Sequence, residues 1–220
     1  MQALLFDLDG TLTNSKPGIF ASADYLVRKL GYTPDPAFDL SFILGPPSEE
    51  WMEIVLGHYG DDRFREGAEL YRTHQKDGAY LLNAPYAGIV EVLSGLEARG
   101  IKLYVATAKR IDIAKSVLSH FGLDHHFCGV YGSTPDGSRN DKAVVIAELL
   151  RLERLDPETT AMVGDRSYDM VGACKNGLTA LGALWGYGSK QELTEHGAWK
   201  CFQNPQELLA EFATADAQKS

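Results

Sequence analysis

Short apolar runs alternate with longer amphipathic segments along most of this chain. From residue 87 onward the alternation is regular. It predicts helices at 87–99, 110–121, 142–152, 167–175, 189–195 and 204–213, and strands at 102–107, 127–131, 160–164, 178–183 and 199–202. Strands that alternate with helices indicate an α/β protein with a parallel sheet and right-handed crossovers.

The beginning of the chain breaks this alternation. The apolar run at residues 3–8 predicts a buried strand, but the next regular segments, at 17–30, 48–57 and 61–76, have helical patterns. Pro17 suits the first turn of a helix and Gly31 the position after its end. We therefore expect a helical domain at 15–81, inserted into an α/β core formed by 1–14 and 82–220.

Composition and charge narrow the class of protein. The chain has 220 residues, of which 45% are apolar and 23% charged, as in an ordinary soluble protein. The net charge of −9 argues against a nucleic-acid polymer as a partner. An anionic substrate would then need locally placed cations or a metal ion.

Cysteine usage and the amino-terminal sequence favour a cytoplasmic protein. Cys128, Cys174 and Cys201 are odd in number and irregularly spaced, which argues against a disulfide framework or a zinc site. The first residues do not have the pattern of a signal peptide. No apolar run approaches the length of about 18 residues that spans a bilayer, so we expect no membrane partner.

The candidate chemistry begins after the first predicted strand. Ligands of open parallel sheets bind beyond the carboxyl ends of the strands, where Asp7-Leu8-Asp9-Gly10-Thr11 lies. Extended residues two apart point the same way, so Asp7 and Asp9 can face one site. A lone Asp-Gly pair would more simply be a turn. The longer string Asp-x-Asp-Gly-Thr is expected by chance in about one chain in a thousand of this length.

This string resembles the first motif of the haloacid dehalogenase-like hydrolase superfamily. The other three motifs of that superfamily follow in order at predicted strand or helix ends: Thr107, then Lys142, then Asp165 with Asp169. Taken alone, Thr107 suits an ordinary strand, Lys142 a solvated surface and Asp165 a helix cap. The resemblance covers essentially the whole chain. It implies a Rossmannoid three-layer α/β/α sheet, with an all-helical cap inserted between the first two motifs.

The resemblance also implies roles for the matching residues. Asp7 would be the nucleophile that forms an aspartyl-phosphate, and Asp9 the general acid and base. The phosphate would be held by Thr107, Ala108 and Lys142. Magnesium would be bound by Asp7, Asp165 and the main-chain carbonyl of Asp9, with Asp169, Gly10 and Thr11 in support. The second aspartate favours phosphate chemistry, because the superfamily's dehalogenases lack it.

The substrate is less well defined by the sequence. The cap position and Gly45-Pro46-Pro47 resemble the phosphoglycolate phosphatase-like subgroup, whereas DGTLTNSKPGI, ILGPP and DGSRNDK more closely resemble 5′-nucleotidases. We expect a phosphomonoester hydrolase for a small metabolite, with nucleoside 5′-monophosphates ahead of phosphoglycolate. Lys16, Gly45 and Arg110 are candidate substrate contacts. Two alternatives stay open: a phosphosugar mutase of the same fold and a non-catalytic phosphate-binding protein. The oligomeric state is also open.

Other conspicuous residues have simpler interpretations. His125 and His126 are expected in a loop without a metal. Trp51, Trp185 and Trp199 are expected to be packing residues, and Cys128 a small core residue within a strand.

Overall fold

The computed structural model describes residues 1–46, 48–134 and 141–212, and the chain divides into two compact units. The first, which we call the sheet unit, is Met1–Asn14 together with Pro85–Ser220. The second, the helical unit, is Ser15–Ala84. Within the described residues, no helix combines the length and apolar character needed to cross a membrane.

The sheet unit is built on a parallel sheet of six strands, in the order β3-β2-β1-β4-β5-β6. The strands are β1 (Ala3–Phe6), β2 (Lys102–Arg110), β3 (Gly129–Ser133), β4 (Thr160–Gly164), β5 (Thr179–Ala183) and β6 (Lys200–Phe202). The central strand β1 is the apolar run at the start of the chain, and all four of its residues are buried. The parallel α/β sheet predicted from the alternation is confirmed.

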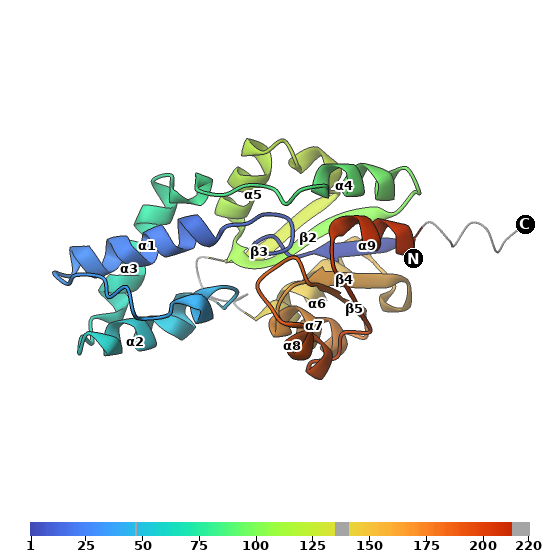
Figure 1. The fold of residues 1–220 in the computed structure, drawn as a ribbon. Helices are drawn as coiled ribbons and strands as arrows, with labels where there is room; N and C mark the ends of the chain where they lie inside the picture. Colours follow the sequence, from blue (N-terminus) through green and yellow to red (C-terminus); the bar gives the residue numbers. More distant parts are fainter. Residues whose placement is uncertain (47, 135–140, 213–220) are drawn as a thin grey trace, which may run out of the picture. The chain divides into compact units, whose positions relative to one another are not determined.

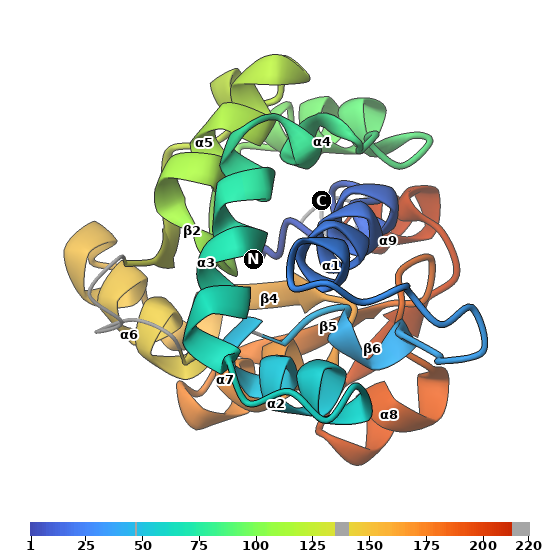
Figure 2. The same cartoon turned by 90° about the vertical axis from the view of Figure 1, so that its left-hand side faces the viewer.

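Helices cover both faces of this sheet, so the unit has three layers. Its helices are α4 (Ile89–Glu97), α5 (Ile111–His120), α6 (Lys142–Glu153), α7 (Ser167–Lys175), α8 (Lys190–Glu195) and α9 (Pro205–Glu211), with 3-10 turns η3 (Asp124–His126) and η4 (Pro157–Thr159). Helices α4 and α5 lie on one side of the sheet and α6, α7 and α8 on the other (Figures 1 and 2). One core cluster joins Leu5 and Tyr104 of the sheet to Ile146 and Met170 of two helices. Alternation along β1 directs Leu4 and Phe6 to the opposite face.

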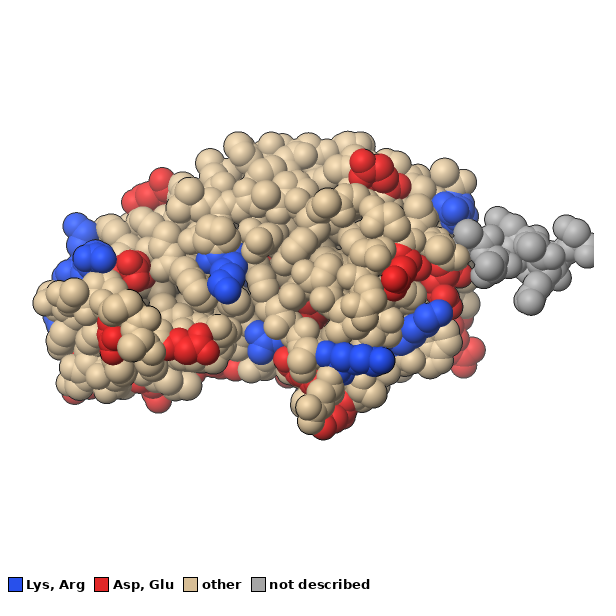
Figure 3. All heavy atoms as spheres, in the orientation of Figure 1, with Lys and Arg blue, Asp and Glu red and all other residues tan. Residues whose placement is uncertain are grey.

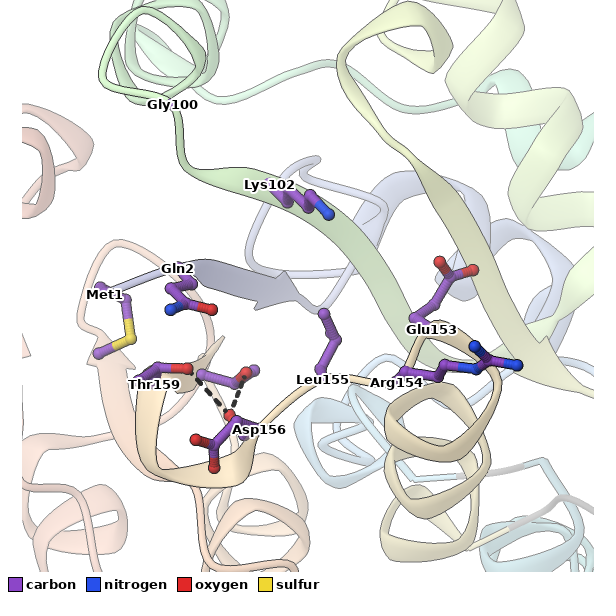
Figure 4. A pocket seen from close by; sticks show the side chains of 10 residues that line it. Met1, Gln2, Gly100, Lys102, Glu153, Arg154, Leu155, Asp156 and Thr159 are labelled. Atoms are coloured by element: carbon purple, nitrogen blue, oxygen red, sulfur yellow. Dashed lines mark hydrogen bonds between the residues drawn. The ribbon is translucent and has the colours of Figure 1, made fainter.

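A pocket of about 380 Å³ opens at the amino-terminal edge of the sheet. Its lining includes Gln2, which precedes β1, and Lys102 and Thr160, which begin β2 and β4 (Figure 4). Ligands of open parallel sheets bind at the opposite, carboxyl edge. This pocket therefore lies away from the residues that the motifs single out.

The helical unit has α-helices and 3-10 turns among its described residues. These are α1 (Lys16–Lys29), η1 (Ser41–Ile43), α2 (Ser48–His58), α3 (Phe64–Lys76) and η2 (Ala79–Leu81). Helix α3 packs against both α1 and α2. Buried Gln75 of α3 donates hydrogen bonds to Gly18 O at 3.0 Å and to Ser22 Oγ at 2.8 Å on α1. Buried polar contacts thus join α3 to α1.

Several predictions for single residues were wrong. The strand expected at 127–131 lies at Gly129–Ser133, so Cys128 precedes it and is exposed. Trp199 is 66% exposed, although we expected it to be packed. His126 lies between α5 and β3, in the segment expected to be a loop, but it is buried and its Nδ1 contacts Glu97.

The charged side chains do not gather by sign on the face shown in Figure 3. Among the described residues drawn there, Lys and Arg side chains lie on the same parts of the face as Asp and Glu side chains.

Candidate active site

The motif residues of the sheet unit meet at the carboxyl edge of the sheet. Asp7 follows β1, Thr107 lies within β2, and Asp165 follows β4. Lys142 begins α6, and its helix is capped by the Asp141 side chain, which accepts a hydrogen bond from Ala143 N–H. Asp169 lies in the first turn of α7. Residues scattered over more than 160 positions of sequence are thus brought to one edge.

A buried ammonium group is central to this cluster. Lys142 Nζ lies 2.7 Å from Asp7 Oδ1 and 2.8 Å from Asp169 Oδ1, and it donates to Ala106 O at 2.9 Å. All three charged side chains are almost completely buried. The ammonium group thus makes two ion pairs and one hydrogen bond. Lys142 therefore fixes two carboxylates at once. Taken alone it suited a solvated surface, but it is an interior group.

Asp165 is held by hydrogen bonds to both of its oxygens. Oδ1 accepts from the Thr11 hydroxyl at 3.1 Å, and Oδ2 accepts from Tyr187 N–H at 2.8 Å. A Cβ at Gly10 would lie 2.2 Å from Asp165 Oδ2, and Gly10 has a φ of +87°. Both the left-handed turn and the close approach require glycine there. Gly10 and Thr11 thus support Asp165 directly.

Asp169 connects the cluster to a helix terminus. Its Oδ2 accepts a hydrogen bond from Arg166 N–H at 3.1 Å, while its Oδ1 faces Lys142. This satisfies one of the free N–H groups at the start of α7. A Cβ at Gly164 would lie 2.3 Å from the Asp169 carboxyl group. The absence of a side chain at Gly164 therefore makes room for Asp169.

The negative charge of the cluster exceeds its positive charge. Ligand oxygens of Asp7, Asp165 and Asp169 lie within 4.8 Å of one another, and all three residues are buried. Burial raises the pKa of Asp7 to about 6; Lys142 opposes this shift, and the charge of Asp169 adds to it. Burial, with Asp169 and Asp7 nearby, also raises the pKa of Asp165 well above its usual value.

These carboxylates fit a divalent cation. Closely spaced buried carboxylates repel one another unless a cation relieves them. The donors are all oxygen atoms, the ligand type that Mg²⁺ prefers. The cluster of carboxylates that could hold a metal ion includes the Asp169 side chain and does not include the Asp9 side chain.

Asp9 is placed by a turn. The strand ends at Phe6, and the chain then folds back so that Gly10 N–H donates to Thr13 O at 2.8 Å. We expected Asp7 and Asp9 to face one site because side chains alternate along an extended strand. Asp9 lies in the turn after the strand, so this alternation does not determine where its side chain points. Asp9 Oδ2 lies 2.9 Å from Lys109 Nζ, and its buried Oδ1 has no hydrogen-bond partner among the described residues.

Thr107 and Ala108 lie in an irregular stretch of β2. Ala106 pairs with Tyr131 and Arg110 with Ser133, so residues 107–109 lie opposite Gly132 alone. A bulge of this kind re-aims side chains and frees backbone groups from the ladder. The buried Thr107 hydroxyl accepts a hydrogen bond from Lys109 N–H at 3.2 Å.

The candidate substrate contacts are distributed over both units. Lys16 and Gly45 belong to the helical unit, where the Lys16 ammonium lies 5.2 Å from the centre of the Phe20 ring and Gly45 has a φ of +109°. Arg110 belongs to the sheet unit and pairs with Asp112 through contacts of 3.1 and 2.7 Å. Of the loop string DGSRNDK, residues 136–140 lie outside the described residues.

Two residues with direct contacts to the site were missed in the sequence. Lys109 contacts Asp9, and Tyr187 donates its N–H to Asp165. Lys109 stands two residues after Thr107 in the sequence, and this spacing was a usable signal. Tyr187 lies between Gly186 and Gly188, and nothing in its residue type indicates a contact made through the backbone.

Comparison with known proteins identifies the family to which this chain is similar. Residues 4–183 match the family described as haloacid dehalogenase-like hydrolase. A Pseudomonas aeruginosa protein named 5′-nucleotidase is 38% identical over 195 residues, covering 88% of this chain and 87% of that protein. An Aquifex aeolicus protein named phosphoglycolate phosphatase is 29% identical over 191 residues, covering 85% and 86%.

A further relative carries a different name, and a solved structure shares the fold. Mycobacterium tuberculosis PtkA, named a tyrosine-protein kinase, is 38% identical over 189 residues. The match covers 85% of this chain but 63% of PtkA, so the chain spans less than two thirds of that protein. The crystal structure of a predicted phosphatase from Clostridium acetobutylicum has a TM-score of 0.88 and 34% identity, covering 96% of this chain and 98% of the other.

Proposed function

Because the chain belongs to the haloacid dehalogenase-like hydrolases and is a phosphatase of that family, we propose that Asp7 is its nucleophile. The substrate would be a small phosphate monoester. The observation that carries this proposal is the placement of Asp7: it is buried, fixed by Lys142 and adjacent to two further carboxylates at the carboxyl edge of the sheet.

The reaction would proceed in two steps. In the first, an Asp7 oxygen forms a bond to phosphorus as the bond to the leaving oxygen breaks, and Asp9 gives that oxygen a proton. In the second, Asp9 removes a proton from water, which attacks the aspartyl-phosphate and releases inorganic phosphate. The unpaired Asp9 Oδ1 supports this role, since it has no internal hydrogen bond to give up.

Fixed positive and dipolar groups would stabilise the transferring phosphoryl group. The Thr107 hydroxyl and the backbone N–H groups of the bulge, including that of Ala108, are suited to its oxygens. Lys142 would share its ammonium between Asp7 and a phosphoryl oxygen. Its existing contacts also keep the nucleophile oriented and favour its ionised form.

A magnesium ion would be held by Asp7, Asp165 and the main-chain carbonyl of Asp9, with Asp169, Gly10 and Thr11 in support. When bound, it would supply charge stabilisation to the phosphoryl oxygens. The charge excess of the buried carboxylates supports this assignment. It also allows a chain of net charge −9 to accept an anionic substrate.

We propose that the helical unit is the cap, and that it supplies contacts to the leaving group. Among substrates we favour nucleoside 5′-monophosphates ahead of phosphoglycolate. The relative named 5′-nucleotidase is 38% identical, compared with 29% for the one named phosphoglycolate phosphatase. In this proposal, Lys16 and Gly45 of the helical unit and Arg110 are the first positions to test for selectivity.

The test is phosphate release from a panel of nucleoside 5′-monophosphates, phosphoglycolate and hexose phosphates, with and without Mg²⁺. We expect Mg²⁺-dependent release that is highest with nucleotides and abolished in a folded Asp7→Asn variant. Conversion of a hexose 1-phosphate without release would indicate the mutase. Binding of phosphate esters without turnover would indicate the non-catalytic protein, and either result would overturn the proposal.

A further inference from the structure

The loop Trp185–Gly188, between β5 and α8, is packed tightly against Asp165. A Cβ at Gly186 would lie 2.3 Å from Asp165 Cβ and 2.3 Å from Gly10 O. A Cβ at Gly188 would lie 2.0 Å from Asp165 O. Both positions thus require glycine because another backbone segment occupies the space of a side chain.

The same loop controls both oxygens of the Asp165 carboxylate. Tyr187 N–H donates directly to Oδ2 at 2.8 Å. The other oxygen accepts from the Thr11 hydroxyl, and the Thr11 carbonyl in turn accepts from Trp185 Nε1–H at 2.9 Å. A carboxylate offers about four lone-pair sites, so these two bonds orient it and leave capacity for a cation.

The loop is itself anchored through the Tyr187 hydroxyl. This hydroxyl donates to Asn14 Oδ1 at 3.2 Å and is hydrogen-bonded to the Tyr86 hydroxyl. Burial, with Tyr187 and Asp165 nearby, raises the pKa of Tyr86, so Tyr86 remains a neutral phenol. Asn14 is the last residue before the chain leaves the sheet unit, and Tyr86 follows Pro85, where the chain returns. One side chain therefore joins the loop to both of these segments.

We propose that Trp185–Gly188 is a positioning element for the metal ion, with Tyr187 as its central residue. It fixes Asp165 in one orientation before the ion arrives, so the ion does not have to order its own ligand. This inference rests on the proposed function, because it takes Asp165 as a metal ligand. Groups that orient metal ligands commonly affect metal affinity by about 10–100-fold when they are removed.

The test is Mg²⁺ binding to the metal-free, full-length protein, measured by calorimetry without substrate. Two variants change the loop. Gly188→Ala places a methyl group against Asp165 O and should weaken binding by at least about 10-fold. Tyr187→Phe keeps the ring and the backbone N–H but removes the hydroxyl, and should weaken binding by about 3- to 10-fold, below the range for removal of a direct partner.

Two controls match these substitutions elsewhere. Gly57→Ala adds a methyl group where no atom lies within 4 Å. Tyr104→Phe removes a hydroxyl that donates to Glu153, away from Asp165. Both controls should bind Mg²⁺ as the wild type does. Thermal unfolding identifies any variant that does not fold, and if Gly188→Ala does not fold, Tyr187→Phe decides.

The outcomes separate this inference from the proposed function. Weaker binding in the loop variants alone supports the positioning role. Wild-type affinity in both loop variants would show that the loop is merely structural and would overturn the inference while the metal site stands. A wild-type protein that binds no Mg²⁺ would overturn both.

Discussion

Each of the two aspartates with a proposed chemical role has its own lysine. Lys142 contacts Asp7 at 2.7 Å, and Lys109 contacts Asp9 at 2.9 Å. The pairs differ in what else the lysine contacts, because Lys142 also contacts Asp169 at 2.8 Å and donates to Ala106 O at 2.9 Å. Lys142 thus belongs to a buried cluster with two carboxylates, and Lys109 holds a single carboxylate, that of Asp9.

Replacing Lys109 should mainly impair protonation of the leaving group. In Lys109→Met, Asp9 loses its partner and its fixed position, and general acid catalysis is worth about 10²–10⁴-fold in rate. We expect kcat/KM to fall by about 10–100-fold for an alkyl phosphate, a partial loss of that effect. The decrease should be much smaller for p-nitrophenyl phosphate, whose leaving group needs no proton.

The control for this prediction is Lys115→Met, which removes an exposed lysine from α5. It should leave both rates unchanged. An equal loss with both substrates in Lys109→Met would contradict a role through Asp9.

Irregular parts of regular elements position these side chains. The bulge in β2 places residues 107–109 opposite Gly132, and a Cβ at Gly132 would lie 2.5 Å from Lys109 O. The first turn of α7 carries Asp169, and the start of α6 carries Lys142. The site therefore depends on a strand irregularity and two helix termini as well as on the ends of the strands.

Gly132→Ala tests the importance of the bulge. The added methyl group cannot be accommodated unless the backbone near Lys109 moves, which displaces Thr107 and Lys109 together. Because small misplacements of catalytic groups can cost about 10²-fold, we expect kcat/KM to fall by about 10- to 100-fold. The kinetics of Gly57→Ala, whose new methyl group meets no atom within 4 Å, provide the comparison. An unchanged kcat/KM in Gly132→Ala would show that the bulge does not position the site.

The sequence predicted the regular elements well because burial on both faces gives parallel strands continuous apolar runs. It also singled out Asp7, Thr107, Lys142 and Asp165, which the structure places at one edge of the sheet. Strand length was less predictable. β2 continues to Arg110 through polar residues, because its ladder resumes after the bulge.

Contacts between distant segments could not be predicted from local pattern. The backbone N–H of Tyr187 reaches Asp165 across 22 positions, and backbone groups are the same in every residue type except proline. The predictions for Cys128 and Trp199 were wrong because they relied on residue type. Cysteine and tryptophan favour burial, but both residues lie next to the start of a strand, where the chain is exposed.

The molecule carries excess negative charge both overall and in the buried cluster of the sheet unit. The net charge is −9, and three buried carboxylates meet Lys142. In the metal-free protein this arrangement opposes folding whenever the carboxylates are ionised. Stability, metal binding and pH should therefore be linked.

Asp7 should make the metal-free protein less stable as the pH rises. Its pKa is 3.8 ordinarily and about 6 in the folded protein, so the folded state binds its proton more tightly. The resulting stabilisation is complete below about pH 4 and is lost as the pH rises through 6. It amounts to up to about 3 kcal/mol, and the raised pKa of Asp165 acts in the same direction.

The measurement is the free energy of unfolding by urea, from pH 4 to pH 7, in the presence of a chelator. The difference in stability between Asp7→Asn and wild type should grow in favour of the variant across this range. Asp62→Asn, at an exposed carboxylate, should not show this trend. If the difference in unfolding free energy between Asp7→Asn and wild type were the same from pH 4 to pH 7, the charge excess assigned to the cluster would be contradicted.

Isolation of the covalent intermediate tests the central claim most directly. Wild-type protein would be mixed with Mg²⁺ and substrate, quenched in acid within milliseconds, digested and mapped by mass spectrometry. A phosphoryl group on the peptide containing Asp7, absent from Asp7→Asn, is the predicted result. A phosphoryl group on another residue, or turnover with no phosphorylated peptide at any quench time, would contradict Asp7 as the nucleophile.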